Sequence, residues 1–158
     1  MNKNFLLKYA INYLSKYNSS KKNLERILKS KILRITKIKK ERFELYSKIE
    51  GIIVELEKNN LINDKFFIQS KINFFSLLGK SKLFIKSYLI KKGVEKNIIE
   101  EQFYEFEEKN NDWEKKSALI FAKKKKLLDN NKDINKSLAK MSRAGFSYEI
   151  CKEILGIS

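Results

Sequence analysis

A helix-glycine-helix unit occurs twice in the sequence at a constant offset, and this repeat restricts the possible folds more than any other feature. The copies read GKSKLFIKSYLIKKGVEKNIIEEQF over 79–103 and NKSLAKMSRAGFSYEICKEIL over 135–155. At an offset of 52 residues Gly93 falls on Gly145, and apolar positions on both sides also coincide, such as Leu89 with Met141. Apolar residues at helical spacing before and after the glycine predict two helices that pack different faces. A tandem helical repeat is therefore the expected architecture.

Both glycines are expected to end a helix. Each follows a helix-length segment rich in Lys or Arg, where a left-handed closing residue costs least without a Cβ atom. Ser147 is well placed to accept from the first free N–H groups of the next helix, and Glu95 takes that place in the other copy. The chain has five glycines and no proline, which disfavours all-β architectures because these need many tight turns.

The helical pattern divides the chain into three sets of three helices. We expect repeats over residues 1–62, 63–109 and 110–158, with an insertion at about 34–46 in the first. This insertion could lengthen the third helix or form a basic loop, and the sequence leaves both alternatives open. A polar loop is expected over 129–133. Because each small unit buries too little surface alone, we expect an all-α, elongated and curved molecule built from stacked three-helix repeats.

The charge of the chain is large and unevenly distributed. A formal charge of +16 favours an anionic partner. Lysines outnumber arginines 31 to 4 and asparagines number 15, a bias that an AT-rich genome would also produce, so a compositional origin stays open. Residues 21–40 hold nine basic residues and one acid, Glu25, whereas 95–114 hold eight acids and two lysines.

Basic residues are the candidate contacts to DNA or to an anionic protein surface. Lys22, Arg26 and Lys29 share one helical face at spacings of i, i+4 and i+7. The lysines of 123–126 must spread around more than one helical turn, so a merely solvated helix end explains them equally well. The full candidate set is Lys21, Lys22, Arg26, Lys29, Arg34, Lys123, Lys124, Lys126 and Arg143.

Residues that could support catalysis are scarce. Histidine is absent, Cys151 is the only cysteine, and no Gly-rich phosphate loop occurs, which leaves few routes to metal or nucleophilic catalysis. The acids of 100–108 fit a solvated helix face better than a catalytic pair. Cys151 takes the place of Ile99 in the repeat and fits core packing. Trp113 could stack on a base, but a core position is expected. We predict no catalytic, metal-binding or cofactor-binding residue.

The sequence also restricts the expected compartment. A single cysteine excludes an intrachain disulfide and suits a reducing cytoplasm. No stretch reaches the roughly 18 apolar residues of a membrane-spanning helix. The first 17 residues read as an amphipathic helix rather than as a signal peptide. We expect a cytoplasmic monomer without a membrane or cofactor partner.

Three motifs, in order along the chain, resemble the RecX family of regulatory proteins. The segment 60–66, NLINDKF, resembles the family's glycine-aromatic-leucine-Asp-Asp-x-x-Phe junction. The segment 79–103 resembles the second family repeat, and 143–148, RAGFSY, is similar to the final Arg-Gly-Phe-Ser/Pro-Tyr segment. Two departures are Asn60, where a glycine is usual, and the 34–46 insertion.

The resemblance implies tandem three-helix repeats and a non-enzymatic modulator of the RecA recombinase. Such a protein lodges in the helical groove of the RecA–DNA filament and limits recombination and SOS co-protease activity. A stand-alone basic helical nucleic-acid-binding protein is the alternative function. In either case we expect DNA binding to be weak, non-specific and directed at phosphates.

Overall fold

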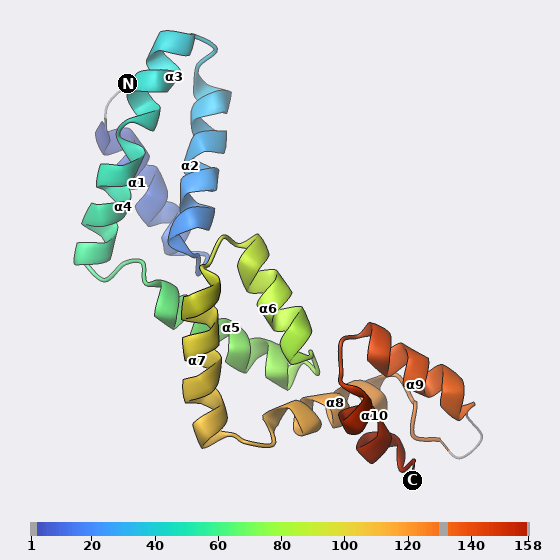
Figure 1. The fold of residues 1–158 in the computed structure, drawn as a ribbon. Helices are drawn as coiled ribbons and strands as arrows, with labels where there is room; N and C mark the ends of the chain where they lie inside the picture. Colours follow the sequence, from blue (N-terminus) through green and yellow to red (C-terminus); the bar gives the residue numbers. More distant parts are fainter. Residues whose placement is uncertain (1–2, 130–132, 158) are drawn as a thin grey trace. The chain divides into compact units, whose positions relative to one another are not determined.

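The computed structural model describes residues 3–129 and 133–157, and every regular element in them is a helix (Figure 1). Residues 130–132 of the expected polar loop lie outside the described residues. The helices are α1 (Lys3–Leu14), α2 (Lys21–Ile35), α3 (Lys39–Tyr46), α4 (Ile49–Lys58), α5 (Asp64–Leu77), α6 (Lys82–Lys91), α7 (Lys96–Lys109), α8 (Trp113–Lys124), α9 (Ile134–Arg143) and α10 (Tyr148–Leu155). The all-α fold class is confirmed.

The insertion at 34–46 forms a separate short helix, which is neither of the two alternatives considered from the sequence. Extended backbone at Thr36 ends α2, and α3 begins three residues later. The Arg42 side chain donates from Nε to the Thr36 carbonyl at 2.8 Å and holds this turn. Leu45 is buried, whereas Phe43 is 76% exposed, so one side of α3 packs against the core. Nine of the described helices match the predicted ones, and α3 is additional.

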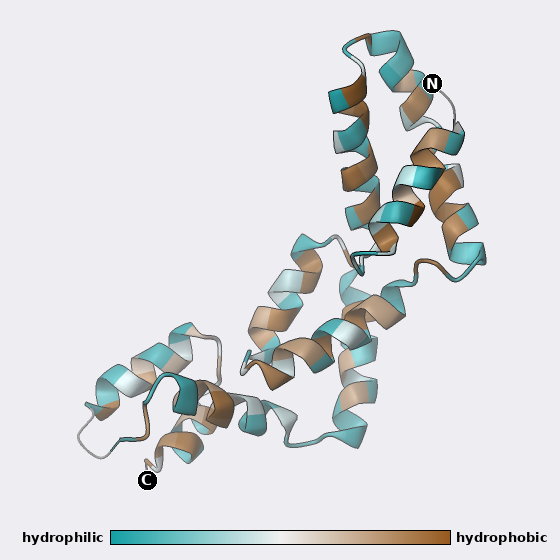
Figure 2. Ribbon diagram, turned by 180° about the vertical axis from the view of Figure 1, so that it is seen from behind, coloured by the Kyte–Doolittle hydropathy of each residue, from teal (hydrophilic) through white to brown (hydrophobic). Residues whose placement is uncertain are grey.

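The chain divides into two compact units, residues 1–67 with 92–94 and residues 68–91 with 95–158. In the first unit, α1, α2 and α4 bury one apolar side each, and hydrophobic residues alternate with hydrophilic ones along these helices (Figure 2). The core of this unit includes Leu6, Ala10, Leu24, Leu28, Ile32, Ile52 and Leu56. In the second unit, α8, α9 and α10 bury Ala118, Ala122, Met141, Phe146 and Cys151 together.

Left-handed residues end helices where the sequence predicted a stop. Gly93 and Gly145 have φ of 77° and 95°, which confirms both predicted stops. Asn60, which stands in the family's glycine position, has φ of 55° and follows the C-terminal cap of α4. Asparagine tolerates this conformation better than most residues with a Cβ atom. Asn60 can therefore occupy this left-handed position in place of a glycine.

Two buried serines join a helix N-terminus to a distant glycine turn. Ser20 caps α2 by accepting from the Asn23 N–H at 3.1 Å, and its hydroxyl donates to the Lys92 carbonyl at 2.5 Å. Ser81 caps α6 by accepting from the Phe84 N–H at 3.2 Å. Its hydroxyl donates to the Ala144 carbonyl at 2.7 Å. Each hydroxyl therefore has partners both as donor and as acceptor, which a buried polar group requires.

Each of these contacts includes two further features. A carboxylate accepts from the first N–H of the helix, and the glycine backbone lies close to the helix N-terminus. The N–H of Lys21 donates to Asp64 at 2.8 Å, and the N–H of Lys82 donates to Glu114 at 2.8 Å. A Cβ atom on Gly93 would lie 2.6 Å from the Lys22 Cβ, too close for any side chain. We call the two sets glycine-serine clasps, formed by Ser20, Lys21, Asp64, Lys92 and Gly93, and by Ser81, Lys82, Glu114, Ala144 and Gly145. The division into three repeats at 1–62, 63–109 and 110–158 stays a prediction.

The substitution Gly145→Val should destabilise the second unit. Valine is strained at a φ of 95°, and its Cβ would lie 2.6 Å from Ser81 Oγ. Left-handed strain alone costs about 1–3 kcal/mol. Urea unfolding followed by far-ultraviolet circular dichroism should show this loss. Gly51→Ala in α4 is the control, because its added Cβ has no heavy atom within 4 Å and should stabilise the helix by about 0.5–1 kcal/mol. Unchanged stability of Gly145→Val would contradict a role for Gly145 as a helix stop.

Candidate nucleic-acid interface

Five candidate basic residues lie on α2. The apolar stripe of this helix, Leu24, Leu28 and Ile32, is fully buried and turns the opposite side outward. Lys21 is half-buried, and the exposed residues are Lys22, Arg26, Lys29 and Arg34. We call Lys22, Arg26 and Lys29 the α2 basic face. This face can approach an anionic surface without rearrangement of the core.

Glu25 neutralises part of the α2 basic face. Its two carboxylate oxygens accept from Lys22 and from Lys29, both at 2.6 Å. These hydrogen bonds, from Lys22 first and then from Lys29, lower the pKa of Glu25. Sequence analysis counted Glu25 as an isolated acid and overlooked its role. The i, i+3 and i, i+4 spacings to the two lysines were the signal that could have revealed it.

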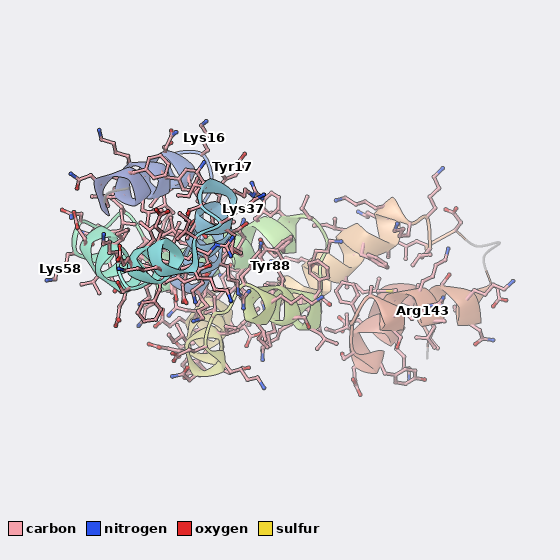
Figure 3. All side chains as sticks on the ribbon, turned by 90° about the horizontal axis from the view of Figure 1, so that it is seen from above. Lys16, Tyr17, Lys37, Lys58, Tyr88 and Arg143 are labelled. Carbon is pink, nitrogen blue, oxygen red and sulfur yellow. The ribbon has the colours of Figure 1, made fainter. Side chains whose placement is uncertain are left out.

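The remaining candidates belong to the second unit. Lys123 and Lys124 form the last turn of α8, and the Lys124 ammonium donates to the Leu78 carbonyl at 3.2 Å. Lys126 has φ of 53° and so occupies the left-handed position that follows α8. Arg143 is the last residue of α9 and carries an exposed side chain (Figure 3). All these cations are exposed, but the candidates of the second unit are distributed over the end of α8, the residues after it and the end of α9.

The acidic stretch 95–114 contacts lysines of the neighbouring helix. On α7, Glu100 pairs with Lys86 at 2.6 Å, and Glu107 pairs with Lys82 at 2.7 Å. A hydrogen bond to Glu108 raises the pKa of Tyr104 on the same helix. These pairs join α6 and α7, so part of the acidic stretch lies against lysines of the adjacent helix. They also give two of its carboxylates a structural role.

Trp113 and Cys151 both occupy core positions, as predicted. Trp113 is only 5% exposed, and its ring lies 5.9 Å from that of Phe103 and 5.7 Å from that of Phe106. Its indole N–H donates to Glu107 at 3.3 Å. Cys151 is fully buried, and burial raises the pKa of its thiol. Trp113 is therefore not available to stack on a nucleic-acid base.

The described part of the chain contains neither a candidate metal site nor a candidate membrane-spanning helix. Within residues 3–129 and 133–157, no group of three or more Cys, Asp or Glu side chains is placed to hold a metal ion. None of the helices in these ranges is both long and apolar enough to cross a membrane.

The thiol of Cys151 should react slowly in the folded protein. Its raised pKa keeps the thiol protonated at neutral pH, and only the thiolate is a good nucleophile. Labelling with iodoacetamide at pH 8 should be slow in buffer and fast in denaturant. Equal rates in both conditions would contradict a packing role.

The substitution Glu25→Gln should strengthen binding to polyanions. It removes the carboxylate that holds two ammonium groups, so both can reach phosphates. The slope of log affinity against log salt should steepen by up to about 2, since each phosphate contact contributes about 0.9. Filter binding to duplex DNA across a salt series measures this slope. Glu153→Gln, which frees Lys115 instead, changes the net charge equally and should have a smaller effect. Equal slopes for both variants would mean that only net charge matters.

Two similar sequences and two similar structures all carry the name RecX. No family model matches the chain. Regulatory protein RecX of Myxococcus xanthus is 28% identical over 159 residues, which cover 96% of this chain and 84% of the relative. Regulatory protein RecX of Finegoldia magna is 31% identical over 130 residues, or 78% of this chain, and the match spans 62% of that relative's length.

Solved structures show the same fold. The crystal structure of RecX from Lactobacillus salivarius aligns with a TM-score of 0.71 at 26% identity, covering 98% of this chain and 94% of that chain. A second crystal structure of a regulatory protein RecX also gives a TM-score of 0.71, at 17% identity, and supports the fold alone. By its sequence relatives and its fold, the chain belongs to the RecX family of regulatory proteins.

Proposed function

We propose that this protein is a non-enzymatic regulator that binds the RecA–DNA filament and modulates, mainly by inhibition, RecA recombinase and SOS co-protease activity. The observation that carries the proposal is the likeness to regulatory proteins named RecX over nearly the whole chain. The protein acts as a cytoplasmic monomer and needs no cofactor.

The α2 basic face supplies a physical means of contact with the filament. Lys22, Arg26 and Lys29 extend over about two helical turns, or about 11 Å. Exposed ammonium and guanidinium groups on such a face attract phosphates and acidic side chains without reading base sequence. Contact with bare DNA is therefore weak and salt-dependent, and the protein surface of the filament adds the specificity.

Co-sedimentation tests this function directly. The protein should pellet with RecA–single-stranded DNA filaments at moderate salt in greater amount than with bare DNA. Equal retention on both would favour a stand-alone nucleic-acid-binding protein, which is the alternative function. A protein that binds neither would refute both.

The triple reversal Lys22→Glu, Arg26→Glu, Lys29→Glu should leave folding intact and weaken inhibition of RecA. Substitutions at these exposed positions usually change stability by less than about 0.5 kcal/mol, although Gly93 lies against Lys22. The reversal replaces attraction by repulsion, so inhibition of RecA strand exchange should fall and should depend less on salt.

The matched control is the reversal of Lys123, Lys124 and Lys126, which removes the same charge from exposed positions at the end of α8. Lys126→Glu leaves a side chain at a left-handed position, as in the parent, so backbone strain is unchanged. This control should inhibit more strongly than the α2 variant. If the α2 variant inhibits RecA as well as the parent does at physiological salt, the α2 face has no role in the filament contact.

A further inference from the structure

Four aromatic rings cluster between α5 and α6 in the second unit. Phe75 is central, because its ring centroid lies 5.3 Å from that of Phe74, 5.4 Å from that of Phe84 and 4.8 Å from that of Tyr88. Phe84 and Tyr88 are one helical turn apart on α6, and Figure 3 labels Tyr88 there. We call Phe74, Phe75, Phe84 and Tyr88 the aromatic face.

Lysine ammonium groups lie over these rings. Lys80 Nζ is 4.6 Å from the centroid of Phe84. Lys71 Nζ is 5.7 Å from the centroid of Phe74 and 5.9 Å from that of Tyr88. The aromatic face therefore combines π surfaces with positive charge.

The face is open to solvent on part of its area. Phe74 is 53% exposed and Phe84 is 38% exposed. Leu77, one turn after Phe74 on α5, is 74% exposed. Exposed aromatic rings that contact one another offer flat apolar area to a binding partner.

The charged residues that α5 and α6 contribute within the second unit are all lysines. Residues 68–91 contain five lysines and no Asp or Glu. The neighbouring acids Glu100 and Glu107 of α7 are occupied by Lys86 and Lys82. Beyond the end of α5, Lys124 contacts the Leu78 carbonyl and adds a further cation. A ligand that carries both negative charge and flat apolar groups would therefore complement this face.

We propose that the aromatic face binds the unpaired bases of a single-stranded nucleic acid, with Phe74 and Phe84 as stacking platforms and Lys71 and Lys80 as phosphate contacts. An exposed cation–π contact is worth about 0.5–1 kcal/mol. Base stacking on an aromatic side chain is worth about 1–3 kcal/mol. A base therefore displaces an ammonium group from the ring with a net gain, and the flexible lysine stem lets that group reach the adjacent phosphate.

This site differs from the phosphate contacts proposed for α2, because it requires free bases. Duplex bases are already stacked and paired, and unstacking costs a few kcal/mol per step. The face should therefore favour single strands, whereas a purely phosphate-directed surface would favour the more densely charged duplex. The proposal does not depend on RecA.

Fluorescence anisotropy with three labelled ligands tests the site: oligothymidylate, an abasic oligomer with the same number of phosphates, and a duplex of the same length. The parent protein should bind oligothymidylate most tightly. Phe74→Ala with Phe84→Ala should weaken this binding by about 5-fold to 100-fold for each stack lost, and should leave abasic binding unchanged. Phe74→Ala alone, at the more exposed position, keeps the test valid if the double variant folds poorly.

Tyr104→Ala is the matched control, because Tyr104 is a 66% exposed ring that lies among the acids of α7. Its binding to all three ligands should match the parent. The buried Trp113 lies outside the aromatic face, so its fluorescence reports whether each variant keeps the packing of the second unit.

Two results would overturn the proposal. One is equal affinity of the parent for oligothymidylate and the abasic oligomer. The other is unchanged oligothymidylate binding by the double variant, and loss of RecA-filament binding in that variant would then identify the face as a protein interface. Because the oligonucleotide assay contains no RecA, failure here leaves the proposed RecA function standing, and failure of that function leaves this result standing.

Discussion

The hydrogen bond from a buried serine hydroxyl to the carbonyl before a left-handed glycine is the contact on which the described architecture depends. Ser20 and Ser81 are both fully buried, so an unpaired hydroxyl at either position would cost about 1–3 kcal/mol. Each hydroxyl avoids this cost by accepting from its own helix and donating to a segment more than sixty residues away. The glycine is required because its backbone must approach the helix N-terminus closely.

The second clasp also brings opposite helix ends together. The N-terminus of α6 carries unpaired N–H groups and partial positive charge, and the C-terminus of α9 presents carbonyl groups and partial negative charge. Glu114 adds a full negative charge, which accepts from the Lys82 N–H even though burial raises the pKa of this carboxyl. Polar groups thus fix an angle between helices that apolar side chains alone would leave adjustable.

Short sequence patterns predicted most of the helices and their ends, because N-caps and left-handed C-terminal residues depend on a few neighbouring positions. Ser147 caps α10 and Gly93 and Gly145 end helices, as expected from the sequence. Sequence reasoning did not find α3, because the break at Thr36 carries no glycine or proline. It also weighed Trp113 as a stacking residue and overlooked the aromatic face, since exposure depends on which helices cover a ring. The free positive charge on α2 was overestimated because Glu25 pairs with both Lys22 and Lys29, which the local spacing could have indicated.

The helix α9, which corresponds to α6 in the repeat, is capped by an aspartate instead of a serine. Asp133 accepts from the N–H groups of Asn135 and Lys136, at the position that corresponds to Ser81. An ionised carboxylate has no proton to donate, so Asp133 does not combine capping with donation to a distant carbonyl as Ser20 and Ser81 do. The choice between a hydroxyl and a carboxylate at one cap therefore decides whether a helix N-terminus is tied to a distant carbonyl or only to its own first turn.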